Sequence, residues 1–187
     1  MKDKKGFIIL VIGIVIFMVG AYALYTQLSE RIAPPEQLAT KPTQQTQQIQ
    51  RAPDFTVYDK EGNAVKLSDF FGKPIVLNFW ASWCGPCQSE MPDFQEKYQE
   101  LGNDIQFLMV NMTDGQRETL EVASEFIAQK GYTFPVLYDT QAQAATTYSV
   151  YSLPTTYFID AQGNVAAQAT GALDAATLQR GIDMIKD

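Results

Sequence analysis

Cys84 and Cys87 are the only cysteines of this 187-residue chain, and their Cys-x-x-Cys spacing constrains the fold more than any other feature. They follow an apolar run, residues 74–80, that is typical of a buried strand. The segment that begins at Gly85 is typical of a helix, and Pro86 suits its first turn because proline lacks an N–H group. We therefore expect the dithiol where a buried strand meets a helix N-terminus.

A helix N-terminus favours the chemistry of disulfide exchange, in which the thiolate is the nucleophile. A free cysteine has a pKa of about 8.5 and is mostly protonated at neutral pH. Unpaired N–H groups and the helix dipole stabilise negative charge at this end. Cys84 is thus the expected attacking thiol, and Cys87, one turn on and less exposed, resolves the mixed disulfide. Trp83 is expected to shield the edge of the site.

A structural disulfide or a metal site are the alternatives for this motif. A structural zinc site needs a full tetrahedral set of ligands, and the chain has no histidine and no third cysteine, so we expect no metal ion. A disulfide over so short a loop stabilises a fold little through chain entropy. We favour a redox-active Cys84–Cys87 disulfide that needs no added cofactor.

The sequence of residues 83–87, Trp-Cys-Gly-Pro-Cys, resembles the active-site motif of the thioredoxin superfamily. A second match is residues 152–156, Ser-Leu-Pro-Thr-Thr, before a strand-like segment. The resemblance implies an α/β thioredoxin-like fold, in which helices flank a central mixed β-sheet. It also implies that Pro154 follows a cis peptide bond and packs against the dithiol, whereas an ordinary trans loop proline is the alternative.

Within this superfamily, the chain from about Ala52 to its end resembles the ResA/TlpA-like membrane-anchored thioredoxins. The residues that carry this likeness are Ala-Pro-Asp-Phe-Thr-Val from Ala52, the run from Phe71 to Cys84, and Glu-Met-Pro from Glu90. Gly85 is a departure, because ResA has an acidic residue there.

Two polar residues near the motif, Glu90 and Asn78, have expected roles in the site. Glu90 lies three residues after Cys87, which places the two side chains on nearly the same face of a helix. The resemblance implies that Glu90 tunes the thiols and accepts the Cys87 proton; the alternative is a solvated helix charge. Asn78 stands where thioredoxin has a buried, titrating Asp, and we expect it to be a hydrogen-bonding strand residue that supports the site.

The N-terminal part predicts a membrane anchor and a tether. Residues 1–6 are lysine-rich and residues 7–25 are apolar and uncharged, about 28 Å as a helix, which is close to the thickness of a bilayer core. The lysines favour a cytoplasmic N-terminus, so the protein would be single-pass in the cell membrane with its redox domain on the extracytoplasmic side. A cleaved signal peptide is the alternative. Residues 26–52, rich in Pro, Gln and Thr, predict a flexible linker.

Residues 53–187 are expected to form one domain. The expected elements are an N-terminal hairpin, a strand, the redox helix, a strand, a helix, an inserted unit, a second hairpin and a last helix capped by Asp174. Their ranges are 55–58 with 64–66, 75–80, 85–101, 105–111, 118–130, the inserted strand 133–138 with helix 140–148, 155–160 with 165–170, and 174–185. ResA/TlpA-like proteins have an insertion at the place of the inserted unit.

Charge limits the classes of partner. Residues 53–187 carry eighteen acidic and eight basic side chains, a net charge of −10. An acidic domain argues against binding nucleic acid.

The resemblance implies a function outside the membrane. It implies a reductase of protein disulfides, with apocytochrome c in cytochrome c maturation as a substrate and a membrane electron-donor protein of the thiol-relay type as the reductant. The residues leave open a thiol oxidase or isomerase, and also a non-catalytic tethered binding module.

Overall fold

The computed structural model describes residues 50–186 and the isolated positions 18, 19 and 22. Contacts along the chain divide it into residues 1–36 and 37–187, and every element below belongs to the second unit. Within the part of the chain that is described, no helix has the length and apolar character needed to cross a membrane. The expected segments 1–6, 7–25 and 26–52 lie almost wholly outside the described residues, and their boundaries stay predictions.

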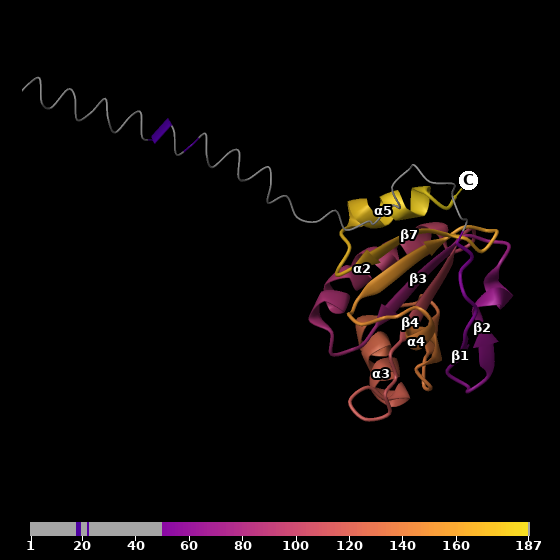
Figure 1. Cartoon of the computed structure of the whole chain (residues 1–187). Coiled ribbons are helices and arrows are strands. Elements are labelled where there is room, and N and C mark those ends of the chain that lie inside the picture. The colour runs from indigo at the N-terminus through magenta and orange to yellow at the C-terminus, as the bar shows by residue number, and fades with distance from the viewer. Residues whose placement is uncertain (1–17, 20–21, 23–49, 187) are drawn as a thin grey trace, which may run out of the picture. The chain divides into compact units, whose positions relative to one another are not determined.

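A seven-stranded mixed sheet forms the centre of the described domain (Figure 1), in the order β2-β1-β5-β4-β3-β6-β7. The strands are β1 (Thr56–Tyr58), β2 (Ala64–Lys66), β3 (Ile75–Trp80), β4 (Gln106–Asn111), β5 (Val136–Tyr138), β6 (Thr155–Ile159) and β7 (Val165–Thr170). Strand β3 pairs parallel with β4 and antiparallel with β6, so the strand before the dithiol is central. Strand β5 pairs with β4 and β1 and joins the N-terminal hairpin to the sheet.

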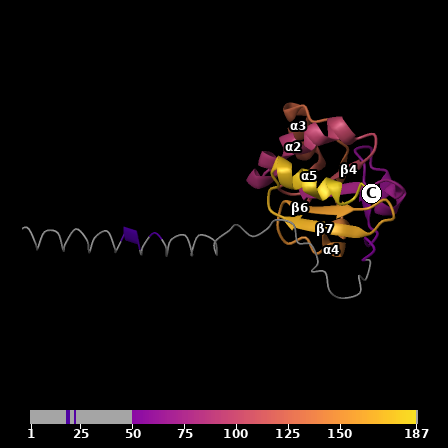
Figure 2. The same cartoon turned by 90° about the horizontal axis from the view of Figure 1, so that it is seen from above.

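Helices cover both faces of this sheet, as Figure 2 shows from above. They are α2 (Gly85–Leu101), α3 (Leu120–Lys130), α4 (Gln143–Thr147) and α5 (Ala175–Asp183), with a short 3-10 helix η1 (Leu67–Phe70). Helices α2, α3 and α5 lie on one face, and α4 lies on the other.

Strand β3 is buried on both faces, which explains why all of its residues except Asn78 are apolar. Its side chains alternate between two hydrophobic cores. Ile75, Leu77 and Phe79 belong to the core beneath α4, while Val76 and Trp80 belong to the core beneath α2 and α5. By the same alternation, Asn78 lies on the same side of the strand as Val76 and Trp80, which is the side covered by α2, the helix that carries the dithiol.

Both predicted hairpins are present, and their turns share one sequence pattern, Asp-x-x-Gly-Asn. In the first turn Asp59 Oδ1 accepts from the N–H of Asn63 at 2.8 Å, and in the second Asp160 Oδ1 accepts from the N–H of Asn164 at 2.8 Å. The glycine of each turn has a φ of 84°, in the left-handed region that favours glycine. The local sequence therefore determines both turns.

The boundaries of other elements differ from the expectation. The helix predicted over residues 118–130 begins at Leu120, because the Thr119 side chain accepts from the N–H of Val122 and caps it. Glu118 is therefore outside the helix, and it is buried. The inserted strand and helix are present but shorter than 133–138 and 140–148. Asp174 caps α5, as predicted.

Candidate active site

Cys84 lies at the N-cap of α2, as the sequence predicts. Its Sγ accepts from the backbone N–H of Cys87 at 3.2 Å, and Pro86 occupies the first turn. The two sulfurs are joined in a disulfide with an S–S distance of 2.07 Å. The sulfur of Cys84 is therefore placed where the unpaired N–H groups and dipole of α2 stabilise a thiolate.

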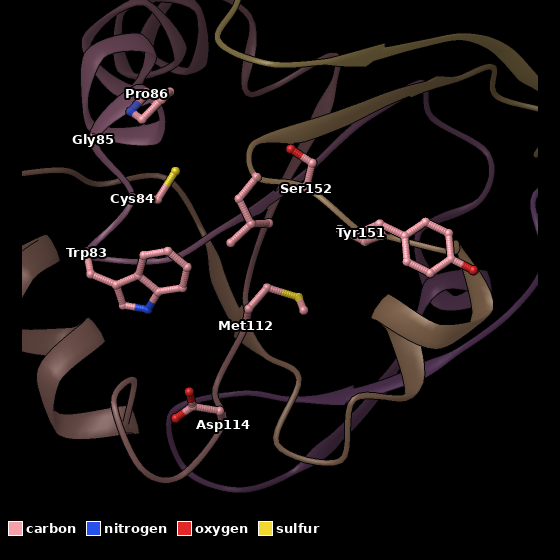
Figure 3. A pocket seen from close by; sticks show the side chains of 10 residues that line it. Trp83, Cys84, Gly85, Pro86, Met112, Asp114, Tyr151 and Ser152 are labelled. Atoms are coloured by element: carbon pink, nitrogen blue, oxygen red, sulfur yellow. The ribbon is translucent and has the colours of Figure 1, made fainter.

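Cys84 lies at the edge of a cavity of about 450 Å³. Cys84 is 4% exposed and lines the cavity, whereas Cys87 is fully buried, so Cys84 is the more accessible of the two cysteines. Figure 3 shows the cavity between the start of α2 and the loop before β6. Its lining is mostly apolar and comprises Trp83, Cys84, Gly85, Pro86, Met112, Asp114, Val150, Tyr151, Ser152 and Leu153.

Two exposed aromatic residues flank this cavity from opposite sides (Figure 3). Trp83 is 44% exposed, and the guanidinium carbon of Arg117 lies 4.2 Å from the centre of its ring. Tyr151 is 94% exposed. Trp83 thus lies at the edge of the site as predicted, and Tyr151 is a lining residue that the sequence reasoning did not identify.

The peptide bond between Leu153 and Pro154 is cis, which confirms this part of the prediction, while the packing of Pro154 against the dithiol stays a prediction. Leu153 lines the same cavity as Cys84. The carbonyl of Pro154 accepts from the N–H of Gly171 at 2.9 Å, which fixes the loop at the start of β6. The structure therefore brings two segments about 70 residues apart to one cavity.

Glu90 is 1% exposed, so it is not the solvated helix charge of the alternative interpretation. Its Oε1 accepts from Asn78 Nδ2 at 2.8 Å, and its Oε2 accepts from the N–H of Leu173 at 2.8 Å. Burial raises the pKa of Glu90 to about 7, although both hydrogen bonds oppose the rise. A carboxyl with this pKa can take up and release a proton at neutral pH.

Asn78 is the hydrogen-bonding strand residue that was predicted. Its Nδ2 donates to Glu90 Oε1 and, at 3.0 Å, to Thr156 Oγ1 on the neighbouring strand. Its Oδ1 is buried without a hydrogen-bond partner. Asn78 therefore holds the Glu90 carboxyl and has spare acceptor capacity beside it.

Glu118 belongs to this region, although the sequence reasoning assigned it to a helix end. Its carboxyl accepts from the N–H of Ser82 at 2.7 Å, from Ser82 Oγ at 2.6 Å and from Asn111 Nδ2 at 2.6 Å. The sequence around Glu118 does not indicate that its side chain is buried, because an acidic residue beside a helix N-cap is usually solvated. Among the described residues no group of three or more His, Cys, Asp or Glu is arranged to hold a metal ion.

Known proteins resemble this chain in both sequence and structure. The model of the AhpC/TSA family matches residues 49–168. Thiol-disulfide oxidoreductase ResA of Geobacillus kaustophilus is 38% identical over 136 residues, which cover 72% of this chain and 76% of that protein. The ResA of Bacillus subtilis is 33% identical over 136 residues, with 72% and 74% covered.

A solved structure, the exposed lipoprotein thioredoxin Etrx1 of Streptococcus pneumoniae, superposes with a TM-score of 0.59. It is 34% identical, and the match covers 70% of this chain and 98% of that one. These likenesses agree with a Cys-x-x-Cys disulfide at the start of a helix. The chain therefore belongs to the AhpC/TSA family of thioredoxin-like proteins and is a thiol–disulfide oxidoreductase of the ResA type.

Proposed function

We propose that this oxidoreductase works as a reductase of protein disulfides on the extracytoplasmic side of the cell membrane. One observation carries the proposal: Cys84 caps α2 at the edge of an open cavity, while Glu90 is buried on the same helix beyond Cys87. In this arrangement Cys84 is the cysteine that a partner can reach, and a buried carboxyl lies about one helical turn after Cys87. The disulfide itself is the redox group, and no further cofactor takes part.

The first step is attack by the reduced enzyme on a substrate disulfide. The Cys84 thiolate forms a bond to one substrate sulfur, the substrate S–S bond breaks, and the second substrate sulfur leaves as a thiolate. The cavity beside Cys84 accommodates the polypeptide that carries the disulfide, with Trp83 and Tyr151 at its sides. Pro154 presents backbone to the bound chain.

The second step releases the substrate. Cys87 loses its proton to Glu90 and attacks Cys84 Sγ, the mixed disulfide breaks, and the remaining substrate sulfur leaves as a thiolate. The substrate gains two electrons and the enzyme ends as the Cys84–Cys87 disulfide. Glu90 suits this proton transfer because its pKa of about 7 allows both uptake and release. A membrane electron-donor protein of the thiol-relay type then reduces the enzyme again.

Apocytochrome c is the substrate that we propose, with cytochrome c maturation as the process. The support is the family likeness to proteins named ResA. In this proposal residues 7–25 anchor the chain and residues 26–52 tether the domain, so that the dithiol reaches substrates near the membrane.

The test is covalent capture of the substrate. A Cys87→Ser variant stops after the first step, so a mixed disulfide on Cys84 should accumulate in native membranes and disappear on reduction. The variant with both cysteines replaced is the control. The proposal is wrong if Cys87→Ser captures no protein with a Cys-x-x-Cys pair and the wild-type enzyme does not reduce such a disulfide. Recovery of the chain in the soluble fraction would contradict the anchor.

A thiol oxidase uses the same two steps in reverse. Equilibration with glutathione separates the directions, because a reductase remains a dithiol only in strongly reducing mixtures. A disulfide that is reduced readily by millimolar glutathione would favour the oxidase.

A further inference from the structure

The turn that precedes Cys84 is held by a buried carboxyl outside the Cys-x-x-Cys motif. Glu118 is fully buried and accepts from three donors, two of which belong to Ser82. One of these donors is the backbone N–H of Ser82, two residues before Cys84. The Glu118 carboxyl therefore binds the backbone of the strand-to-helix junction.

The same turn is held from other directions. Gln88 Nε2 donates to the carbonyl of Ser82 at 2.6 Å, so both backbone polar groups of Ser82 are bonded to side chains. Arg117, next to Glu118, packs its guanidinium over the ring of Trp83. Two neighbouring residues of one loop thus hold two neighbouring residues of the turn: Glu118 binds Ser82, and Arg117 packs on Trp83.

The loop that carries Glu118 is itself fixed in place. Asp114 Oδ1 accepts from the N–H of Glu118 at 2.9 Å, and the Glu118 carbonyl accepts from the N–H of Gly115 at 3.1 Å. The third donor to the carboxyl, Asn111 Nδ2, comes from the last residue of β4, which pairs with Trp80. Glu118 is therefore a rigid support that links the end of β4 to the turn after β3.

We propose that Glu118 is a positioning residue that fixes the Ser82–Trp83 turn and thereby places Cys84 Sγ at the N-cap of α2. Without the carboxyl, buried donors lose their acceptor and the turn shifts to find other partners. A displaced Cys84 loses its helix N-terminus, so its thiolate is less stable and its attack is slower. This inference depends on the role of Cys84 as the attacking thiol.

The chemistry of the site supplies a matched set of variants. In Glu118→Gln, the remaining oxygen still accepts from Ser82 N–H and Asn111 Nδ2, and the new amide donates to Ser82 Oγ, which also accepts. Glu118→Gln therefore keeps the hydrogen bonds to Ser82 and Asn111 and removes the negative charge. Glu118→Asp keeps the charge but is one methylene too short to reach, and Glu118→Ala removes both.

The experiment measures the rate of iodoacetamide alkylation of Cys84 against pH, with each variant placed in the Cys87→Ser background. Glu118→Gln should keep the parent profile and a rate within about twofold. Glu118→Asp and Glu118→Ala should raise the apparent pKa of the Cys84 thiol and slow disulfide reduction by the intact dithiol about tenfold or more. Circular dichroism checks that each variant is folded.

Two outcomes would overturn the inference. One is a folded Glu118→Asp or Glu118→Ala variant with the parent profile. The other is a Glu118→Gln variant with a raised apparent pKa of the Cys84 thiol while Glu118→Asp keeps the parent profile. The charge of residue 118, and not its hydrogen bonds, would then matter. If Glu118→Ala does not fold, the comparison of Gln with Asp still decides. An unreactive Cys84 in the parent itself would instead contradict the proposed attack by this residue.

Discussion

The buried carboxyl of Glu90 should make the stability of this protein depend on pH in an unusual direction. Its pKa is 4.5 as a free side chain and about 7 in the folded protein, mainly because burial disfavours the charged form. The folded protein therefore binds this proton more tightly than the unfolded chain does. The contribution of Glu90 to the free energy of unfolding is greatest below about pH 4.5 and is lost as the pH rises through about 7.

The size of the effect follows from the two pKa values. Each pKa unit corresponds to about 1.4 kcal/mol, so the interval from 4.5 to about 7 gives about 3 kcal/mol. This is a large share of the stability of a domain of this size, which is commonly about 5–15 kcal/mol. Other carboxyls with shifted pKa values (Asp59, Asp114, Glu121 and Asp174) are all shifted downward, so they titrate below this pH range.

Glu90→Gln isolates this contribution. The site accommodates a neutral amide, because rotation of the Asn78 amide brings its unpartnered Oδ1 to face the new NH₂ group. The remaining Gln oxygen then accepts from the N–H of Leu173. The variant should therefore be folded, and its stability should lack the fall between pH 4.5 and pH 7.

Urea unfolding of the oxidised protein at several pH values from 4 to 8 measures the difference. The stability of Glu90→Gln relative to wild type should rise by about 3 kcal/mol across this range. Glu96→Gln is the matched control, because it makes the same chemical change at an exposed position of the same helix. A difference between Glu90→Gln and wild type that stays flat from pH 4 to pH 8 would refute the reasoning.

Two further predictions concern packing and capping around α5. Gly181→Ala should destabilise the protein by about 1–3 kcal/mol in urea unfolding, because a Cβ there would overlap the Phe158 ring. A Gly181→Ala variant as stable as the wild type would contradict this packing argument. Asp174→Ala should lower the free energy of unfolding at pH 7, because the Asp174 carboxylate accepts from the N–H of Thr177 at 2.7 Å and caps α5. Asp174→Asn should retain most of this cap, and an equal loss in both variants would contradict the capping explanation.

The sequence alone determined the features that depend on short stretches of chain. The spacing of Cys84 and Cys87 predicts their place at the start of a helix, and the apolar run before them predicts the central strand. The Asp-x-x-Gly-Asn turns and the Asp174 cap likewise depend on residues within a few positions of one another. Such features follow from local hydrogen bonding and periodicity, which the chain carries wherever it folds.

Only the tertiary structure decided what the acidic residues do. The sequence predicts Glu118 only as the first residue of a helix, and for Glu90 it leaves a solvated helix charge open as the alternative, yet both side chains are buried. The partners of Glu90 are Asn78, on β3, and Leu173, which is 83 positions away, while Glu118 binds Ser82 across 36 positions. Whether a carboxyl is solvated or buried depends on which distant segments pack over it, and burial is what changes its pKa and its role.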